Sequence, residues 1–62
     1  MTVKDLTKGA SPVTMFYVSL RQGDDIEEYD KGHAKELDPY TLSAPVLYYR
    51  AAGKDMIDVT IF

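Results

Sequence analysis

The clearest alternation of hydrophobic and polar residues runs from Met56 to Phe62. Successive side chains of a β-strand point to opposite faces, so the apolar residues of this run share one face: Ile57, Val59 and Ile61. A second strand, Val46–Ala52, precedes it across the short turn Gly53–Asp55. The pattern predicts a β-hairpin with one face in the core, and we expect that removing the last one or two residues loosens this core.

An earlier hairpin is predicted from Val13–Leu20 and Ile26–Lys31. The turn formers of Arg21–Asp25 separate these two segments. The first strand places three apolar residues on one face: Phe16, Val18 and Leu20. The second strand is highly charged, and charged side chains protect the edge of a sheet against unwanted pairing. We therefore expect it at an edge.

Two short helical segments complete the pattern. Thr2 can cap a first helix, with Asp5 completing a capping box and Gly9 ending it. His33–Leu37 predicts a helical turn that Asp38-Pro39 interrupts, followed by a connector at Tyr40–Ser43. In these segments the apolar anchors expected to face the core are Val3, Leu6, Leu37 and Leu42.

The order helix, hairpin, short helix, hairpin predicts one α+β domain over residues 1–62. Its sheet would have four strands, mostly antiparallel, with the helical pieces on one face. The pattern leaves the strand order open. Val13–Leu20 and Met56–Phe62 are the most apolar strands and are therefore expected to form the central pair.

The charge balance restricts the classes of partner. The 62 residues include ten acidic and seven basic side chains, a net charge of −3, and half of the acidic ones fall between Asp24 and Asp30. This distribution argues against direct nucleic-acid or anionic-membrane binding and favours a protein with a basic surface. The chain has no cysteine, and we find neither a signal peptide nor an apolar run of bilayer length. We expect a cytoplasmic protein.

Three parts of the chain carry a resemblance: the opening Thr2-Val3-Lys4-Asp5-Leu6, the Gly-x-Ala-x-Glu-Leu element at Gly32–Leu37, and the apolar strand at Ile57–Ile61. Together they resemble small proteins, without a common assigned activity, that bacteriophages and other mobile elements of Gram-positive bacteria carry. The resemblance implies a setting in a phage or its host. Some small acidic phage proteins block host defence systems by occupying a protein surface, which is the function that the resemblance suggests.

Catalytic and metal-binding motifs are not found. His33 is the single imidazole, and we interpret it as an exposed residue at a helix start. The acidic run is not an EF-hand loop, because Ile26 and Tyr29 stand where ligands or the glycine belong. No serine lies in a nucleophile motif. We expect no enzyme, no cofactor and no metal.

The remaining hypothesis is a binding surface made of an acidic edge and a tyrosine-bearing sheet face. Its candidate residues are Asp24, Asp25, Glu27, Glu28, Asp30, Met15, Tyr17, Tyr29, Tyr48 and Tyr49. A specific form is a DNA mimic or defence inhibitor that presents carboxylates to a basic groove. The alternatives are a solvated edge that only prevents aggregation and a homodimeric structural component of a phage or host assembly.

Overall fold

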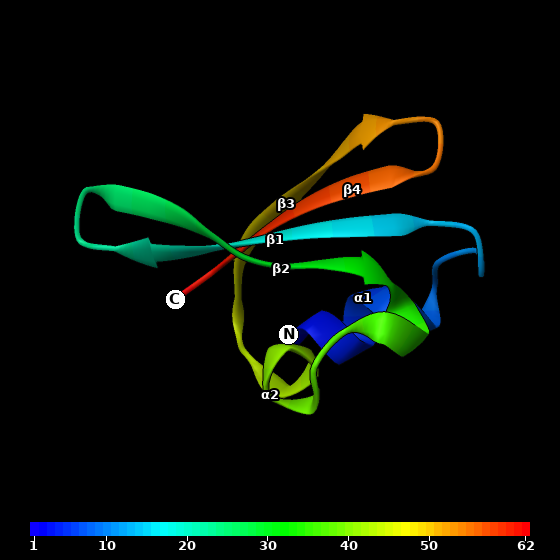
Figure 1. Ribbon diagram of the computed structural model, residues 1–62, viewed down its shortest axis with the longest axis horizontal. Helices are drawn as coiled ribbons and strands as arrows, with labels where there is room; N and C mark the ends of the chain where they lie inside the picture. Colours follow the sequence, from blue (N-terminus) through cyan, green and yellow to red (C-terminus); the bar gives the residue numbers. More distant parts are fainter.

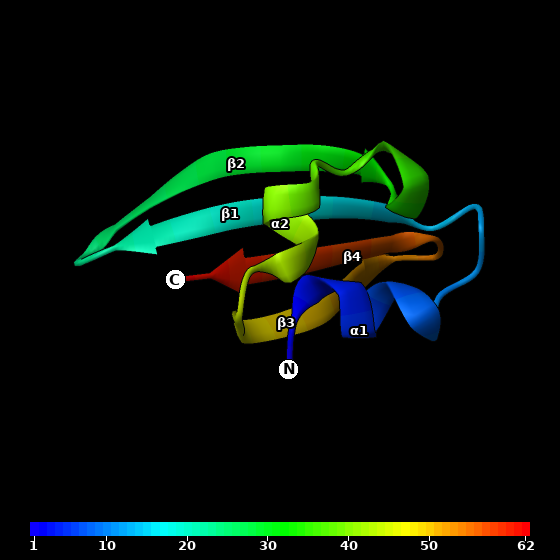
Figure 2. The same cartoon turned by 90° about the horizontal axis from the view of Figure 1, so that it is seen from below.

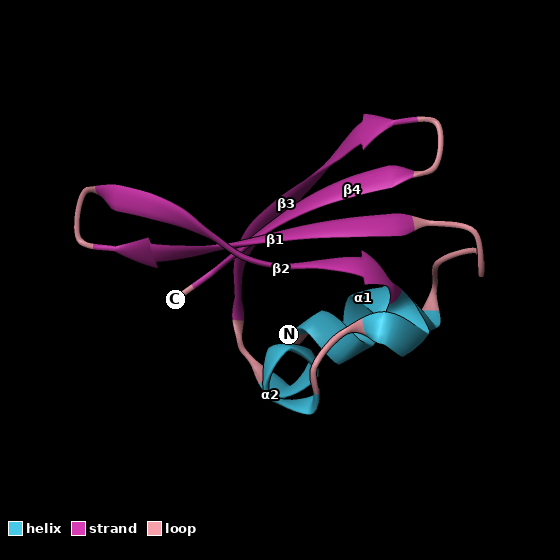
Figure 3. Cartoon of the chain, in the orientation of Figure 1, coloured by secondary structure: helices cyan, strands magenta, loops and turns pink.

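A computed structural model describes residues 1–62 as a four-stranded sheet with two short α-helices (Figure 1). The elements are α1 (Val3–Lys8), β1 (Met15–Gln22), β2 (Asp25–His33), a 3-10 turn (Ala34–Glu36), α2 (Pro39–Ser43), β3 (Val46–Gly53) and β4 (Met56–Ile61). All helical segments lie on one face of the sheet (Figures 2 and 3). The predicted small α+β fold with a mostly antiparallel sheet is confirmed. No helix is both long and apolar enough to cross a bilayer.

The strand order is β2-β1-β4-β3, so the two hairpins meet along their most apolar strands. The predicted central pair is confirmed, and its two strands run parallel. Phe16 lies beside Ile57 and Val18 beside Val59, so their apolar sides share the helix-covered face. β2 is an edge strand, as its charge predicts.

The core is a single layer between the sheet and the helices. Its buried hydrophobic residues are Val3, Phe16, Val18, Leu37, Val59 and Ile61. Phe16 is the largest of the fully buried side chains, and Leu6 and Leu42 pack against the cluster as predicted. The predicted capping box at α1 is confirmed, since Asp5 N–H donates to Thr2 Oγ1 and Thr2 N–H donates to the Asp5 carboxylate.

The segment between β2 and β3 differs from the prediction. Asp38-Pro39 begins a helix, α2, where we expected an interruption followed by a connector. The physical reason is that Asp38 caps the helix by accepting from Tyr40 N–H at 2.9 Å, while proline is well suited to the first helical position. The helical turn predicted at His33–Leu37 is confirmed as the 3-10 turn Ala34–Glu36.

The expectation that the last two residues both support the core is wrong for the final one. Phe62 is 63% exposed, whereas Ile61 is 2% exposed. Phe62 lies beyond the end of β4 and has no paired residue on either neighbouring strand.

Candidate functional site

The β1–β2 hairpin projects as an arm beyond the part of the sheet that the helices cover (Figures 1 and 2). Every residue from Arg21 to Tyr29 is exposed. Gln22 pairs with Asp25, which leaves Gly23 and Asp24 as a two-residue turn. Gly23 has a φ of +64° at the first turn position, a conformation that favours glycine. The arm is thus a fixed hairpin that solvent surrounds on both faces.

Segment 21–31, which includes this arm, carries a charge equal to the net charge of the whole molecule. The segment 21–31 contains five acidic and two basic residues, which gives −3, and the rest of the chain contains five of each sign. Glu28 forms an ion pair with Lys31 at 3.7 Å. Asp24, Asp25 and Glu27 have no basic side chain within 4.0 Å. Their charges are therefore free to attract a cationic group from outside.

An irregularity in β2 distributes these carboxylates over both faces. The register shifts between Val18 and Ser19, so Tyr29 is an extra residue between Asp30 and Glu28. Asp30 pairs with Val18 and Glu27 with Leu20, which places both on the helix side, whereas Glu28 lies on the open side beside Ser19. The arm presents negative charge in two directions.

Asp30 differs from the other acidic residues because it holds β2 to α2. Its Oδ2 accepts from Asp38 N–H at 3.0 Å and from Thr41 Oγ1–H at 2.8 Å, and its Oδ1 accepts from Lys31 N–H at 2.8 Å. The hydrogen bond from the Asp38 backbone is the largest cause that lowers the Asp30 pKa, although partial burial opposes it. Asp30 is therefore a charged structural residue as well as a candidate binding residue.

Beside Asp30 lies a shallow notch of about 320 Å³, between the irregular part of β2 and α2. It is lined by Tyr29, Asp30, Asp38, Tyr40 and Thr41. Tyr40 is 81% exposed and Tyr29 is 47% exposed, so both phenol rings are accessible beside two carboxylates. The sequence pattern did not indicate Asp38 and Tyr40 as site residues. The signal that could have found them is the Asp-Pro helix start, which makes Asp38 the N-cap of α2 and places Tyr40 in its first turn.

The structure does not bring the other candidate aromatic residues together. Tyr17 and Tyr48 lie on the open face, because they pair with Asp58 and Thr60 of β4, and Met15 lies on the same face. Tyr49 pairs with Val59 and lies on the helix side, at the edge opposite to Tyr29. The open face is mixed, with Lys31, Asp58 and Arg50 across its middle, and is not a continuous tyrosine surface.

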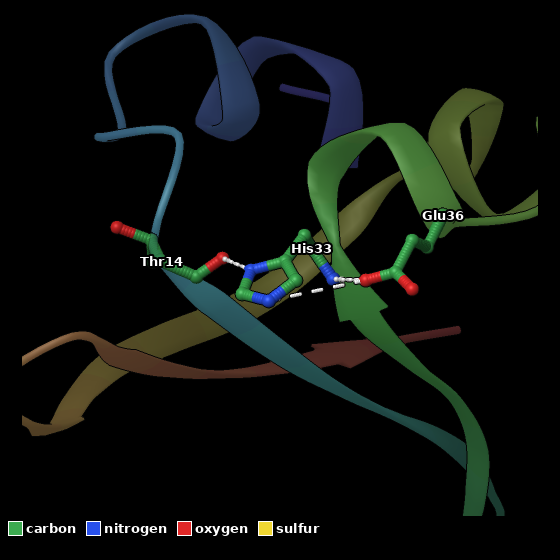
Figure 4. Close-up of polar contacts among 3 residues, drawn as sticks. All are labelled: Thr14, His33 and Glu36. Atoms are coloured by element: carbon green, nitrogen blue, oxygen red, sulfur yellow. Dashed lines mark hydrogen bonds and ion pairs between the residues drawn. The ribbon is translucent and has the colours of Figure 1, made fainter.

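His33 has a structural position at the junction of β1, β2 and the 3-10 turn (Figure 4). Its Nδ1 lies 3.2 Å from the carbonyl oxygen of Thr14, which can only accept, so Nδ1–H is the donor. Its backbone N–H donates to Glu36 Oε1 at 2.9 Å. His33 is at a helix start as predicted, but it is half-buried, not exposed, and the backbone carbonyl of Thr14 lies against its ring.

The chemistry of this region suits electrostatic binding. No group of three or more His, Asp or Glu side chains is arranged to hold a metal ion. The lowered pKa of Asp30 keeps this carboxyl ionised, which is the opposite of the raised pKa that a general acid needs near neutral pH. Ionised carboxylates beside exposed aromatic rings are groups that bind ammonium or guanidinium ions.

The Asp30 contacts predict that the protein becomes less stable in acid. Because the folded-state pKa lies below 3.8, the unfolded chain binds the proton more readily. The stability that the ionised Asp30 carboxylate contributes is present above about pH 3.8. It is lost as the pH falls through the lower folded-state pKa. Asp5 also contributes stability that is lost in acid, because the hydrogen bond that it accepts from the Thr2 backbone N–H lowers its pKa. Thermal unfolding followed by circular dichroism between pH 6 and pH 2 would show the falling midpoint.

Asp30→Asn is expected to make this pH dependence shallower and to cost about 1–2 kcal/mol at neutral pH, because an amide accepts hydrogen bonds less strongly than a carboxylate. Glu27→Gln removes a charge from the same strand where no hydrogen bond is lost, and it should leave the midpoint near the wild-type value. A midpoint of Asp30→Asn that follows the wild type at every pH would contradict the role of Asp30.

No family model, no curated protein and no solved structure matches this chain.

Proposed function

We propose that this protein is a small, non-enzymatic binding module that attaches to the cationic surface of another protein through the β1–β2 arm and the adjacent notch. The observation that carries the proposal is the charge distribution: segment 21–31 has a net charge of −3, and the remainder of the chain is neutral. Three exposed carboxylates of this arm lack a basic partner. Such a concentrated charge steers a basic partner toward one end of the molecule.

The notch supports the proposal with a second type of contact. Asp30 and Asp38 provide negative charge, and Tyr29 and Tyr40 provide exposed aromatic surface. A lysine or arginine side chain can make both types of contact, because it pairs with the carboxylates and lies against an aromatic ring. We infer that the arm attracts the partner over a distance, while the notch receives one of its cationic side chains.

The specific form of this function is an inhibitor, phage-derived as the resemblance suggests, that acts in the host cytoplasm by filling a basic groove. The presence of carboxylates on both faces of the arm supports this form, because a groove surrounds what it binds. In this respect the arm is similar to a nucleic-acid backbone, which also presents negative charge in several directions.

A lysine-rich peptide is a direct probe of this surface. Titrated into the isotope-labelled protein, it is expected to shift the NMR signals of the arm and of Tyr29 and Tyr40, and to leave those of β3 unchanged. Replacing the arm carboxylates by Asp24→Asn, Asp25→Asn, Glu27→Gln and Glu28→Gln should weaken binding about tenfold or more at low salt. Raising the salt concentration should also weaken binding of the peptide to the wild type, because salt screens the charges.

The matched control preserves the charge while changing the side-chain lengths: Asp24→Glu, Asp25→Glu, Glu27→Asp and Glu28→Asp. It should bind as the wild type does. An affinity that is the same for the neutralised variant, or that does not change with salt, would show that the acidic arm is only a solvated edge.

A separate capture experiment identifies the natural partner. It is a protein from a Gram-positive bacterial lysate that the wild type retains and the neutralised variant does not.

A further inference from the structure

The two edges of the sheet differ sharply in how they are protected. β2 carries four acidic residues, Asp25, Glu27, Glu28 and Asp30, and has an irregular register. β3 at the other edge carries a single charged residue, Arg50, whose Nε lies 3.8 Å from Asp58 Oδ2 on the neighbouring strand. The residues from Tyr48 to Gly53 are all exposed. β3 is therefore a nearly neutral edge with backbone groups available for pairing.

The beginning of this edge already pairs with an extended segment. Thr2 and Pro45 form an antiparallel bridge, in which Val46 N–H donates to Met1 O at 2.8 Å and Val3 N–H donates to Ala44 O at 3.1 Å. This pairing ends at Val46, so the edge beyond it is uncovered. The edge is thus compatible with an antiparallel strand, and the free part begins at Leu47.

We propose that β3 pairs antiparallel with β3 of a second copy of this chain, joining two sheets into one around a two-fold axis. The inference does not depend on the proposed binding of a basic partner, which uses the opposite edge. A two-fold axis perpendicular to the sheet keeps the open faces and the helix-covered faces continuous. Residues opposite each other across the new pair must then lie on the same face.

The register follows from the charges. Placing Tyr49 opposite Tyr49 of the second copy sets Arg50 across from Tyr48 of that copy, and both residues lie on the open face. Each guanidinium then contacts an aromatic ring, an arrangement that stabilises a cross-strand pair. A register centred on Arg50 would place two positive charges opposite each other and is disfavoured.

The charge distribution also explains why a second copy fits this edge. The net charge of −3 lies in segment 21–31, which includes most of the opposite edge strand, β2. Pairing through β3 keeps the two acidic arms at the far ends of the joined sheet, whereas pairing through β2 would bring them together. β3 is the edge at which two copies meet with the least electrostatic repulsion.

Sedimentation velocity on the full chain over a range of concentrations tests the pairing. The wild type is expected to change from monomer to dimer as the concentration rises toward the millimolar range. Ala51→Lys should raise the dimer dissociation constant about tenfold or more, because it places a charged side chain opposite Leu47 of the second copy and lysine protects edge strands. Val13→Lys adds the same charge at an exposed loop position and should dimerise as the wild type does.

Hydrogen exchange on the wild type identifies the surface without any substitution. Amides of Leu47–Ala51 should exchange more slowly at high than at low protein concentration, and those of the acidic arm should not. A chain that stays monomeric at millimolar concentration would overturn the proposal. So would a dimer that Ala51→Lys leaves intact or that protects the open face or β2 instead. A monomer whose β3 amides are protected only by an added peptide would show that the edge receives a different strand.

Discussion

Phe16→Ala is expected to leave the protein largely unfolded. Phe16 is fully buried and is the largest of the fully buried side chains, on the central strand β1. Truncating a buried phenylalanine costs about 3–5 kcal/mol, because it removes apolar contacts and leaves a cavity. Domains have a free energy of unfolding of about 0.05–0.15 kcal/mol per residue, so the loss is comparable to the whole stability expected for a chain of this length. Far-ultraviolet circular dichroism and urea unfolding would measure it.

Phe62→Ala is the matched control, since it makes the same chemical change at an exposed position just beyond the sheet. Phe62 is 63% exposed, and its truncation should change the free energy of unfolding by less than about 1 kcal/mol. Equal losses for the two variants would show that the terminal residue belongs to the core and that the single-layer core described above is incomplete.

Gly32→Ala is the second substitution with a large expected effect. Gly32 is buried and has a φ of +146°, a conformation that side-chain-bearing residues rarely adopt. A Cβ at this position would also lie 3.1 Å from the Cβ of Glu36, so β2 and the 3-10 turn would have to separate. Backbone strain of this type costs about 1–3 kcal/mol, and the steric contact adds to it. Thermal or urea unfolding would measure the loss.

Substitutions at two other glycines distinguish the cost of the backbone conformation from the cost of the steric contact. Gly23→Ala, with a φ of +64° and no atom within 4 Å, tests the backbone conformation alone and should cost about 1–2 kcal/mol. Gly9→Ala has neither constraint, as its φ is −93°, and is expected to be neutral or slightly stabilising. If Gly32→Ala were no more damaging than Gly9→Ala, the close approach of the 3-10 turn to β2 would be wrong.

The elements could be predicted because each depends on short-range patterns. Alternation at Ile57, Val59 and Ile61 is enough to indicate a half-buried strand, and Thr2 with Asp5 is enough to indicate a capped helix. α2 was missed because Asp38-Pro39 was interpreted as a break. Aspartate followed by proline equally marks a helix start, and only the hydrogen bond to Tyr40 N–H distinguishes the two.

The candidate site could be predicted only in part. The acidic run and its place on an edge strand follow from charge spacing along the chain. The sequence does not show that Asp30 bonds to Asp38 and Thr41, because these partners are eight and eleven residues away. Alternation also does not predict on which face of the sheet Tyr29 lies. The register shift in β2 interrupts the regular change of side chains from one face to the other.

The sequence by itself determined the four strands, the first helix, the choice of central strands and the concentration of acidic residues between Asp24 and Asp30, because these depend on composition and local periodicity. Tertiary structure alone decided that β1 and β4 run parallel, that the arm projects beyond the helices, and that Tyr40 lies beside Tyr29. These features depend on which apolar faces pack together, and packing joins residues that no local pattern relates. The two edges of the sheet, one acidic and one nearly neutral, acquire their different proposed roles from that arrangement.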